Sequence, residues 1–319
     1  MTIKNKLKIL ILIVVSFVTS ANLSAQDTGK LFPYPVVPDS KTTLSQRCNY
    51  LVDHFWDRAN IKQSFSTLAR LEESFRDWIG FMPYATADTV HMAVDRFIKD
   101  VEKTGAKNLL SIGRMAEANL YSDTAQIRSE EIYLPFCKAV ASNKKISSAE
   151  RARFEAQAKI LEHTQVGMRA PDFDYITPDG RKCNLKDVMS HNIILFFNDP
   201  DCLDCRMAKA RLAADYHTKQ LIDADLLKIV CIYPGEATDE WKAEAATYPE
   251  KWVAGAADGV DEFFALDDFP VFYYLNSRHK IVAKNLVLDN LLKAINLLDV
   301  QQQARAQQEA ARDTTVTAQ

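Results

Sequence analysis

In the first half of the chain, apolar side chains recur every three or four positions, which is the spacing of one helix face. Two such runs are Phe65, Leu68, Phe75, Trp78, Ile79 and Val90, Val94, Phe97, Ile98, Val101. Ser147 and Glu150 have the spacing of a capping box at the start of a further helix. Because no strand pattern interrupts these runs, residues 44–165 are predicted to form an all-α domain.

The second half alternates between short apolar runs and helical patterns. The runs typical of strands are 173–177, 193–198, 226–233, 271–275 and 280–286, and the helical patterns are 203–222, 238–247 and 289–310. This alternation predicts an α/β domain over residues 166–300, with a mixed central sheet and helices on both faces. The Gln/Ala-rich residues 301–319 are predicted to extend the last helix and then form a disordered tail.

The first 25 residues have the pattern of a secretory signal peptide. Its parts are three lysines, a short apolar run and a small residue before the cut: Lys4, Lys6, Lys8, residues 9–18 and Ala25. The apolar run is short for a membrane span, although an uncleaved anchor is the alternative. We therefore expect export, a linker over residues 26–43, and no stable membrane span after cleavage.

Charge and length narrow the class of function. The formal net charge is −3, and removal of residues 1–25 would take away three lysines and no acid, leaving −6. An acidic protein is a poor candidate for nucleic-acid binding, so no nucleic-acid partner is expected. About 290 residues would remain, a length that favours two domains.

The apolar run at 193–198 leads into Cys202-Leu203-Asp204-Cys205, and a helical pattern follows directly. Strand, tight turn, C-x-x-C and helix is the layout of a dithiol redox site. A thiolate at a helix N-terminus faces unpaired backbone N–H groups and the positive end of the helix dipole, which favour the nucleophilic form. Cys202 is therefore predicted to attack a disulfide, and Cys205, one turn later, to resolve the mixed disulfide.

The tetrad Cys202-Leu203-Asp204-Cys205 has three other interpretations: a structural disulfide, a zinc site and a peroxidase site. The sequence leaves one alternative, in which Cys202 and Cys205 form an inert disulfide that closes the helix end. A zinc site needs four ligands, and neither a second C-x-x-C nor a histidine stands at ligand spacing. The peroxidase pattern P-x-x-x-T-x-x-C needs a proline seven positions before a cysteine, where Leu195 and Asn198 stand. We therefore expect no metal and no cofactor.

Four further cysteines lie outside the tetrad: Cys48, Cys137, Cys183 and Cys231. An oxidising compartment would allow them to pair, and the sequence leaves their pairing undetermined. Cys231 lies in the apolar run 226–233 and is predicted to be a buried strand residue.

Four segments resemble the exported thiol–disulfide oxidoreductases of the thioredoxin-like family: residues 166–173, 196–205, 269–272 and 276–282. They resemble, in turn, the first strand with its G-x-x-A-P-x-F pattern, the redox loop, the proline segment and the following hairpin. The resemblance implies that Pro270 is cis, lies against the dithiol and holds backbone to which a substrate strand can pair. Residues 44–164 resemble an uncharacterised helical domain that precedes such domains in secreted proteins of Gram-negative bacteria, through residues 53–57 and 133–136.

The redox loop departs from the family pattern in its charge. Asp201 replaces a common tryptophan, and Leu203-Asp204 stands where Gly-Pro is common. Carboxylates beside the nucleophile oppose the helix dipole, while Arg206 and Lys209 offset them in part. We expect a more reducing dithiol than that of a strong oxidant.

The leading hypothesis is a thiol–disulfide oxidoreductase in the periplasm or another extracytoplasmic space of a Gram-negative bacterium. Its partners would be a protein disulfide or dithiol and an upstream electron donor. The helical domain would bind a partner, form a homodimer or shield the redox face. The alternative is a non-catalytic interaction scaffold whose C-x-x-C disulfide is structural.

Overall fold

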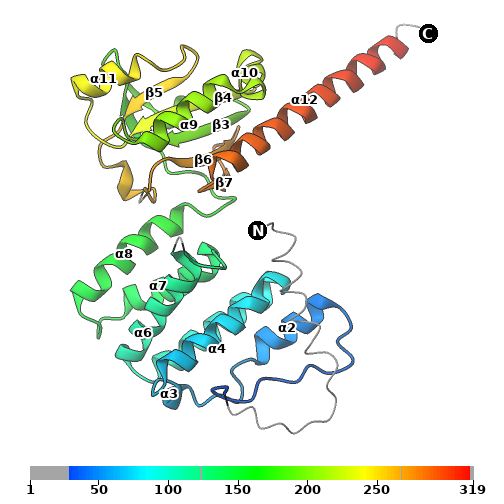
Figure 1. Ribbon diagram of the computed structural model, residues 1–319, viewed down its shortest axis with the longest axis vertical. Helices are drawn as coiled ribbons and strands as arrows, with labels where there is room; N and C mark the ends of the chain where they lie inside the picture. The colour runs from blue at the N-terminus through cyan, green and yellow to red at the C-terminus, as the bar shows by residue number, and fades with distance from the viewer. Residues whose placement is uncertain (1–28, 123, 267, 317–319) are drawn as a thin grey trace. The chain divides into compact units, whose positions relative to one another are not determined.

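The computed structural model describes residues 29–122, 124–266 and 268–316 of the 319-residue chain (Figure 1). The chain divides into two compact units, Met1–Thr104 and Gly105–Gln319. The signal peptide predicted at residues 1–25 lies outside the described residues. Within the described ranges, no helix is both long enough and apolar enough to cross a bilayer.

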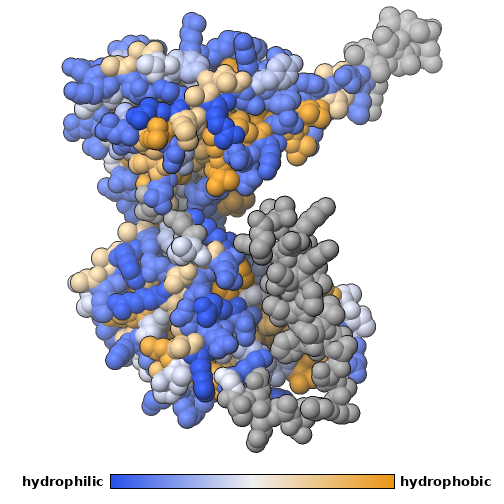
Figure 2. All heavy atoms as spheres, viewed as in Figure 1, coloured by the Kyte–Doolittle hydropathy of each residue, from blue (hydrophilic) through white to orange (hydrophobic). Residues whose placement is uncertain are grey.

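The described part of the first unit is helical and is built around aromatic side chains. Its helices are α2 (Leu44–His54), α3 (Ile61–Ser64), α4 (Leu68–Phe81), the 3-10 turn η1 (Met82–Tyr84) and α5 (Ala87–Glu102). Phe75 and Trp78 on α4 are fully buried, and the Trp78 ring lies 5.0 Å from the Phe97 ring of α5. Both apolar runs therefore form helices with a buried face, whereas Phe65, just after α3, is half-buried. On the face shown in Figure 2, the described surface is mainly hydrophilic.

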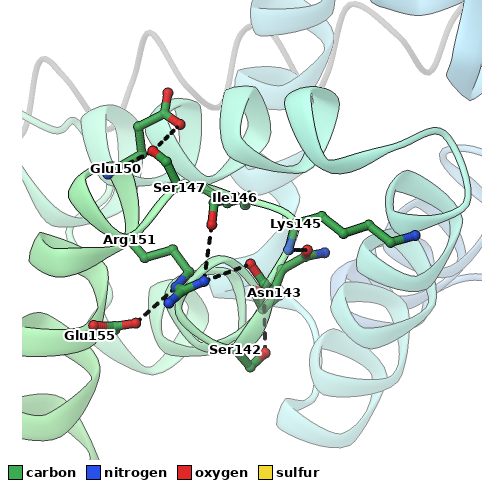
Figure 3. A network of polar contacts seen from close by, with 9 residues as sticks. Ser142, Asn143, Lys145, Ile146, Ser147, Glu150, Arg151 and Glu155 are labelled. Carbon is green, nitrogen blue, oxygen red and sulfur yellow. Dashed lines mark hydrogen bonds and ion pairs between the residues drawn. The ribbon is translucent and has the colours of Figure 1, made fainter.

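The second unit begins with helices: α6 (Ala106–Ala116), the π-helical turn η2 (Glu117–Tyr121), α7 (Glu130–Ser142) and α8 (Ser148–His163). Figure 3 shows the polar network that closes the turn between α7 and α8. Arg151 donates to the Ile146 carbonyl at 3.0 Å and to Glu155 at 2.9 Å. Ser147 caps α8 as predicted by accepting the Glu150 N–H, but the Glu150 carboxylate accepts the Ser147 hydroxyl, so only half of the predicted capping box forms.

A seven-stranded mixed sheet follows in the described part of this unit, in the order β2-β1-β5-β4-β3-β6-β7. The strands are β1 (Asp174–Ile176), β2 (Lys182–Asn184), β3 (Asn192–Phe197), β4 (Leu227–Tyr233), β5 (Val253–Ala256), β6 (Val271–Asn276) and β7 (Ile281–Lys284). β3 pairs in parallel with β4 and antiparallel with β6, and all its residues are buried. The all-helical region and the mixed sheet agree with the predicted fold class.

Successive side chains of β3 point alternately into two hydrophobic cores, one on each face of the sheet. Ile194 and Phe196 face the core that α9 (Leu203–Ala214), α10 (Tyr216–Asp223) and α12 (Leu288–Val316) cover. Phe197 and its alternates face the other core, which the 3-10 turns η3 (Leu185–Asp187) and η4 (Val260–Glu262) help to close. α11 (Asp239–Ala245) packs through Trp241 against Ala256 of β5. α12 extends beyond the sheet and continues to Val316 (Figure 1).

One predicted helix is divided in the structure, and two strands, β2 and β5, were not predicted. The helix predicted at 203–222 is two helices, because Asp215 ends α9 and its carboxylate accepts the Thr218 N–H at 2.8 Å to cap α10. Strand β5 was not predicted, since its four residues include Gly255 and no large apolar run. A Cβ at Gly255 would lie 2.4 Å from the Tyr175 ring, so this position needs glycine.

Candidate functional site: the dithiol at the start of α9

The redox loop connects the buried strand β3 to α9, and Cys202 occupies the N-cap position of that helix. The Cys202 Sγ accepts the backbone N–H of Cys205, with a sulfur–nitrogen distance of 3.1 Å. A serine or aspartate oxygen usually fills this position. A negative sulfur there is stabilised by the free N–H groups and the dipole of the first helical turn.

The two sulfur atoms have different environments. Cys202 is half-buried, whereas Cys205 is 3% exposed and packs in the same core as Ala208 and Leu212. The pKa of the Cys205 thiol is raised to about 12, mainly by burial and then by its hydrogen bond with Cys202, while a backbone hydrogen bond with Asp199 acts in the opposite direction. At neutral pH the buried sulfur is therefore a thiol, and only Cys202 is within reach of solvent.

The proline segment lies against the dithiol, as the resemblance implied. The Phe269–Pro270 peptide bond is cis, and Pro270 is half-buried. The Cys202 Sγ lies 3.7 Å from the Phe269 carbonyl oxygen, which accepts its S–H. The structure thus brings Cys202, Cys205 and the Phe269–Pro270 segment together.

The charges around the loop are arranged differently from the expectation. Asp201 and Asp204 are exposed, and Arg206 donates to the Pro200 carbonyl at 3.1 Å, which holds the loop. Lys209 instead forms an ion pair with Glu244 of α11 and donates to Thr247 at 2.9 Å. The cation of Lys209 is therefore partnered away from the two carboxylates that it was expected to offset.

A tyrosine that the sequence did not point to anchors the start of the redox loop. The Tyr248 hydroxyl donates to the Asn198 Oδ1 at 2.7 Å, and Asn198, 4% exposed, donates to the Phe196 carbonyl at 3.1 Å. We call this pair the Tyr248–Asn198 clamp. Lys209 lies 4.8 Å from the centre of the Tyr248 ring. A polar residue at the end of an apolar strand was the only sequence signal for the clamp.

Of the remaining cysteines, Cys48 belongs to the first unit and Cys137, Cys183 and Cys231 belong to the second. Cys48, Cys137 and Cys231 are buried, and Cys183 is half-buried. Cys231 lies on β4, as predicted, and burial raises the pKa of its thiol. Within the described residues, no group of three or more His, Cys, Asp or Glu side chains is placed to hold a metal ion.

The strand order, the dithiol at the start of the helix after β3 and the proline segment beside it define a thioredoxin-like domain. Residues 16–164 match the family described as "Domain of unknown function (DUF5106)". The chain thus carries this helical domain of unknown function ahead of a thioredoxin-like domain, which is the order that the resemblance implied.

Solved structures agree with this fold. A thioredoxin-like protein from Bacteroides caccae has a TM-score of 0.72 and 24% identity, over 84% of this chain and 99% of that chain. The C-terminal domain of an uncharacterized protein from Bacteroides fragilis has 25% identity over 42% of this chain and 99% of its own, with a TM-score of 0.40. The thioredoxin domain of a thiol-disulfide oxidoreductase from Bacteroides vulgatus has 23% identity over 42% and 97%, with a TM-score of 0.36. The structure of the Bacteroides caccae protein shows the fold of this chain. No curated protein matches the chain.

Proposed function

We propose that the chain is an extracytoplasmic thiol–disulfide oxidoreductase that reduces or exchanges protein disulfides. The observation that supports this most is the asymmetric dithiol: Cys202 is reachable at the N-cap of α9, and Cys205 is buried behind it as a thiol. Such asymmetry separates the attacking sulfur from the resolving one.

In the proposed reaction, the Cys202 thiolate attacks one sulfur of a substrate disulfide. The substrate S–S bond breaks, one substrate thiolate leaves, and a mixed disulfide forms at Cys202. Cys205 then loses its proton to solvent and attacks the Cys202 sulfur, which releases the second substrate thiolate. The substrate gains two electrons and two protons, the protein keeps the Cys202–Cys205 disulfide, and an external dithiol donor must reduce it again.

Trapping the mixed disulfide tests this proposal. Reduced Cys205→Ser protein, mixed with a peptide disulfide, is expected to retain one peptide through Cys202, as read by mass spectrometry after digestion. Cys202→Ser is the matched control and should retain none at the tetrad. If neither variant, or only Cys202→Ser, forms the adduct, the proposal is wrong and the interaction scaffold with a structural disulfide becomes the better account.

Export is the second part of the proposal and is supported by the lysines and apolar run of residues 1–25. Expression of the full chain in a Gram-negative host should give periplasmic protein whose first residue follows Ala25. In the same account the helical domain binds a partner or a second copy, and the dithiol takes electrons from an envelope donor. A chain that keeps residues 1–25 in the cytoplasm would contradict this part.

A further inference from the structure

The outer side of α9 is apolar from its first residue. Leu203 is 62% exposed and Met207 is 52% exposed, and residues four apart lie on the same helix face. The exposed Ala210 and Ala214 continue this face. We call these four residues the outer stripe.

This stripe is unusual for a helix that covers a sheet. The buried side of α9 is apolar too, with Cys205, Ala208 and Leu212 in the core. A surface helix normally has polar residues on its outer side, as the neighbouring α10 does with its exposed Lys219 and Gln220. In Figure 2, hydrophobic spheres lie among hydrophilic ones in the region that α9 occupies in Figure 1.

The stripe starts at the residue after the attacking cysteine and is bordered there by negative charge. Asp201 and Asp204 are exposed on either side of Cys202 and Leu203. Of the two cations of the following turn, Lys209 pairs with Glu244, whereas Arg206 stays at the loop through the Pro200 carbonyl. The approach to Cys202 therefore combines apolar surface with two exposed carboxylates, Asp201 and Asp204, and the single cation of Arg206.

We propose that the outer stripe and the two carboxylates select the substrate of the proposed reaction. The occupant is an extended polypeptide in which a large apolar side chain stands two positions after a disulfide-bonded cysteine and a lysine or arginine lies nearby. Its disulfide must reach the Cys202 Sγ, and side chains two positions apart lie on the same face of an extended chain, so this apolar side chain meets Leu203. The flexible thioether of Met207 adapts to apolar groups of different shape, while the field of Asp201 and Asp204 attracts the cation. This inference rests on the proposed function.

Four disulfide probes test it: a peptide dimer with leucine two positions after the cysteine and a lysine nearby, the same dimer with serine for leucine, the same with glutamate for lysine, and oxidised glutathione. The second-order rate of oxidation of the reduced full-length protein is read by alkylation and mass spectrometry. The wild type should react about tenfold faster with the leucine–lysine peptide than with the serine peptide, the ratio expected from partial burial of one leucine.

Two double variants then distinguish an effect on substrate binding at the outer stripe from an effect on the reactivity of the dithiol. Leu203→Ser with Met207→Gln should slow the leucine–lysine peptide about 5- to 20-fold and leave the rate with glutathione within about twofold. Met189→Gln is the matched control, because Met189 is 75% exposed outside the site. Asp201→Asn with Asp204→Asn should abolish the preference for lysine over glutamate, and added salt should weaken that preference in the wild type.

Four results would overturn the inference. The stripe variant could slow glutathione as much as the peptides, which would place its effect on the dithiol itself. The wild type could react equally with all peptides. The stripe variant could turn a dimer into a monomer without changing the order of the probes, which would make a second copy the occupant. If the wild type reacts with no probe, including glutathione, the proposed function fails and this inference with it.

Discussion

Two cysteines three positions apart become chemically different because one caps α9 and the other faces the core. The capping sulfur of Cys202 is held by an N–H donor and lies beside a carbonyl. The sulfur of Cys205 has lost most of its contact with water. The local sequence indicates this difference, since an N-cap position and a core-facing position follow from helix geometry alone.

The first prediction concerns the stability of the reduced protein at high pH. The pKa of Cys205 is raised from 9.0 to about 12 by burial, so the folded state holds this proton more tightly than the unfolded state. The contribution to stability is complete below pH 9 and is lost as the pH rises from 9 towards about 12. The difference in free energy of unfolding between the wild type and Cys205→Ala should fall over that interval. A difference that stays constant or grows would contradict the burial of a neutral thiol.

The second prediction concerns the Tyr248–Asn198 clamp, for which the chain supplies its own control. Tyr274 donates to Asn192 at 2.6 Å, at the opposite end of the same strand β3. Tyr248→Phe and Tyr274→Phe each leave an asparagine oxygen without its donor, and each should lower the free energy of unfolding by about 1–3 kcal/mol. Only Tyr248→Phe should also change the alkylation rate of Cys202, by at least about threefold, equivalent to roughly 0.7 kcal/mol. Equal alkylation rates in both variants would show that the clamp does not position the redox loop.

At the scale of single residues, the sequence predicted those site residues that stand in a recognisable motif. Cys202 and Cys205 follow from the tetrad, and Pro270 follows from the resemblance of its segment. Tyr248 could not be found in this way, because it meets Asn198 across 50 positions of the chain. No spacing rule connects two residues that only the fold brings together.

At the scale of elements, the break between α9 and α10 shows how one side chain decides a boundary. The helical pattern at 203–222 continues through Asp215, but its carboxylate accepts both the N–H and the hydroxyl of Thr218 at 2.8 Å. A side chain that supplies these bonds favours the start of a new helix over the continuation of the old one.

The third prediction tests this cap. Asp215→Ala should lower the free energy of unfolding by about 1 kcal/mol, since an N-cap acceptor is lost. Asp239→Ala is a suitable control, because Asp239 lies in the first turn of α11 and pairs with the nearby Lys242 at the surface. It should cost less than about 0.5 kcal/mol. Urea unfolding of the two variants gives the comparison, and equal losses would remove the cap as the cause of the break.

Elements with a long periodic pattern were predicted well, whereas the two short strands β2 and β5 were missed. The runs that became α4 and α5 contain four or more apolar positions at helical spacing, and β3 is a continuous apolar run. β2 has three residues and β5 has four, too few for an alternation to be recognised. Pairing with neighbouring strands decides their conformation: β2 pairs with β1, and β5 pairs with β4 along its length and with β1 at one end.

At the scale of the whole molecule, the second unit joins its helices to its sheet through a buried ion pair. Glu130 on α7 pairs with Lys284 on β7, and the two side chains are 10% and 9% exposed. Lys284 also donates to Thr164 at 3.2 Å, and Asn285 donates to Glu130 at 3.1 Å. Burial lowers the pKa of Lys284, and the Glu130 carboxylate opposes that shift.

The fourth prediction is that this pair matters far more than the exposed pair in the same unit. Lys284→Met leaves Glu130 buried without a cation and should cost about 3–5 kcal/mol of unfolding free energy. Lys284→Met combined with Glu130→Leu should recover most of this loss. Lys159–Glu262 is the control, because its side chains are 52% and 64% exposed, and Lys159→Met should cost less than about 1 kcal/mol. Equal costs for the two lysine variants would contradict the account.

The sequence predicted the order of the two kinds of structure but not the division into compact units. The change from helices to strands falls between His163 and Asp174, whereas the units divide at Thr104. Contacts such as Glu130–Lys284 group α6 to α8 with the sheet. They connect residues more than 150 positions apart, and a pattern read along the chain carries no sign of them.

The central claim is that Cys202 and Cys205 form a reducible and asymmetric dithiol. The most direct measurement is a titration of the purified protein in defined thiol buffers, with alkylation of free cysteines and mass spectrometry of the tetrad. The account predicts a midpoint between about −120 and −270 mV, with Cys202 alkylated before Cys205. A tetrad that is still oxidised below about −300 mV would mark a structural disulfide and contradict the claim.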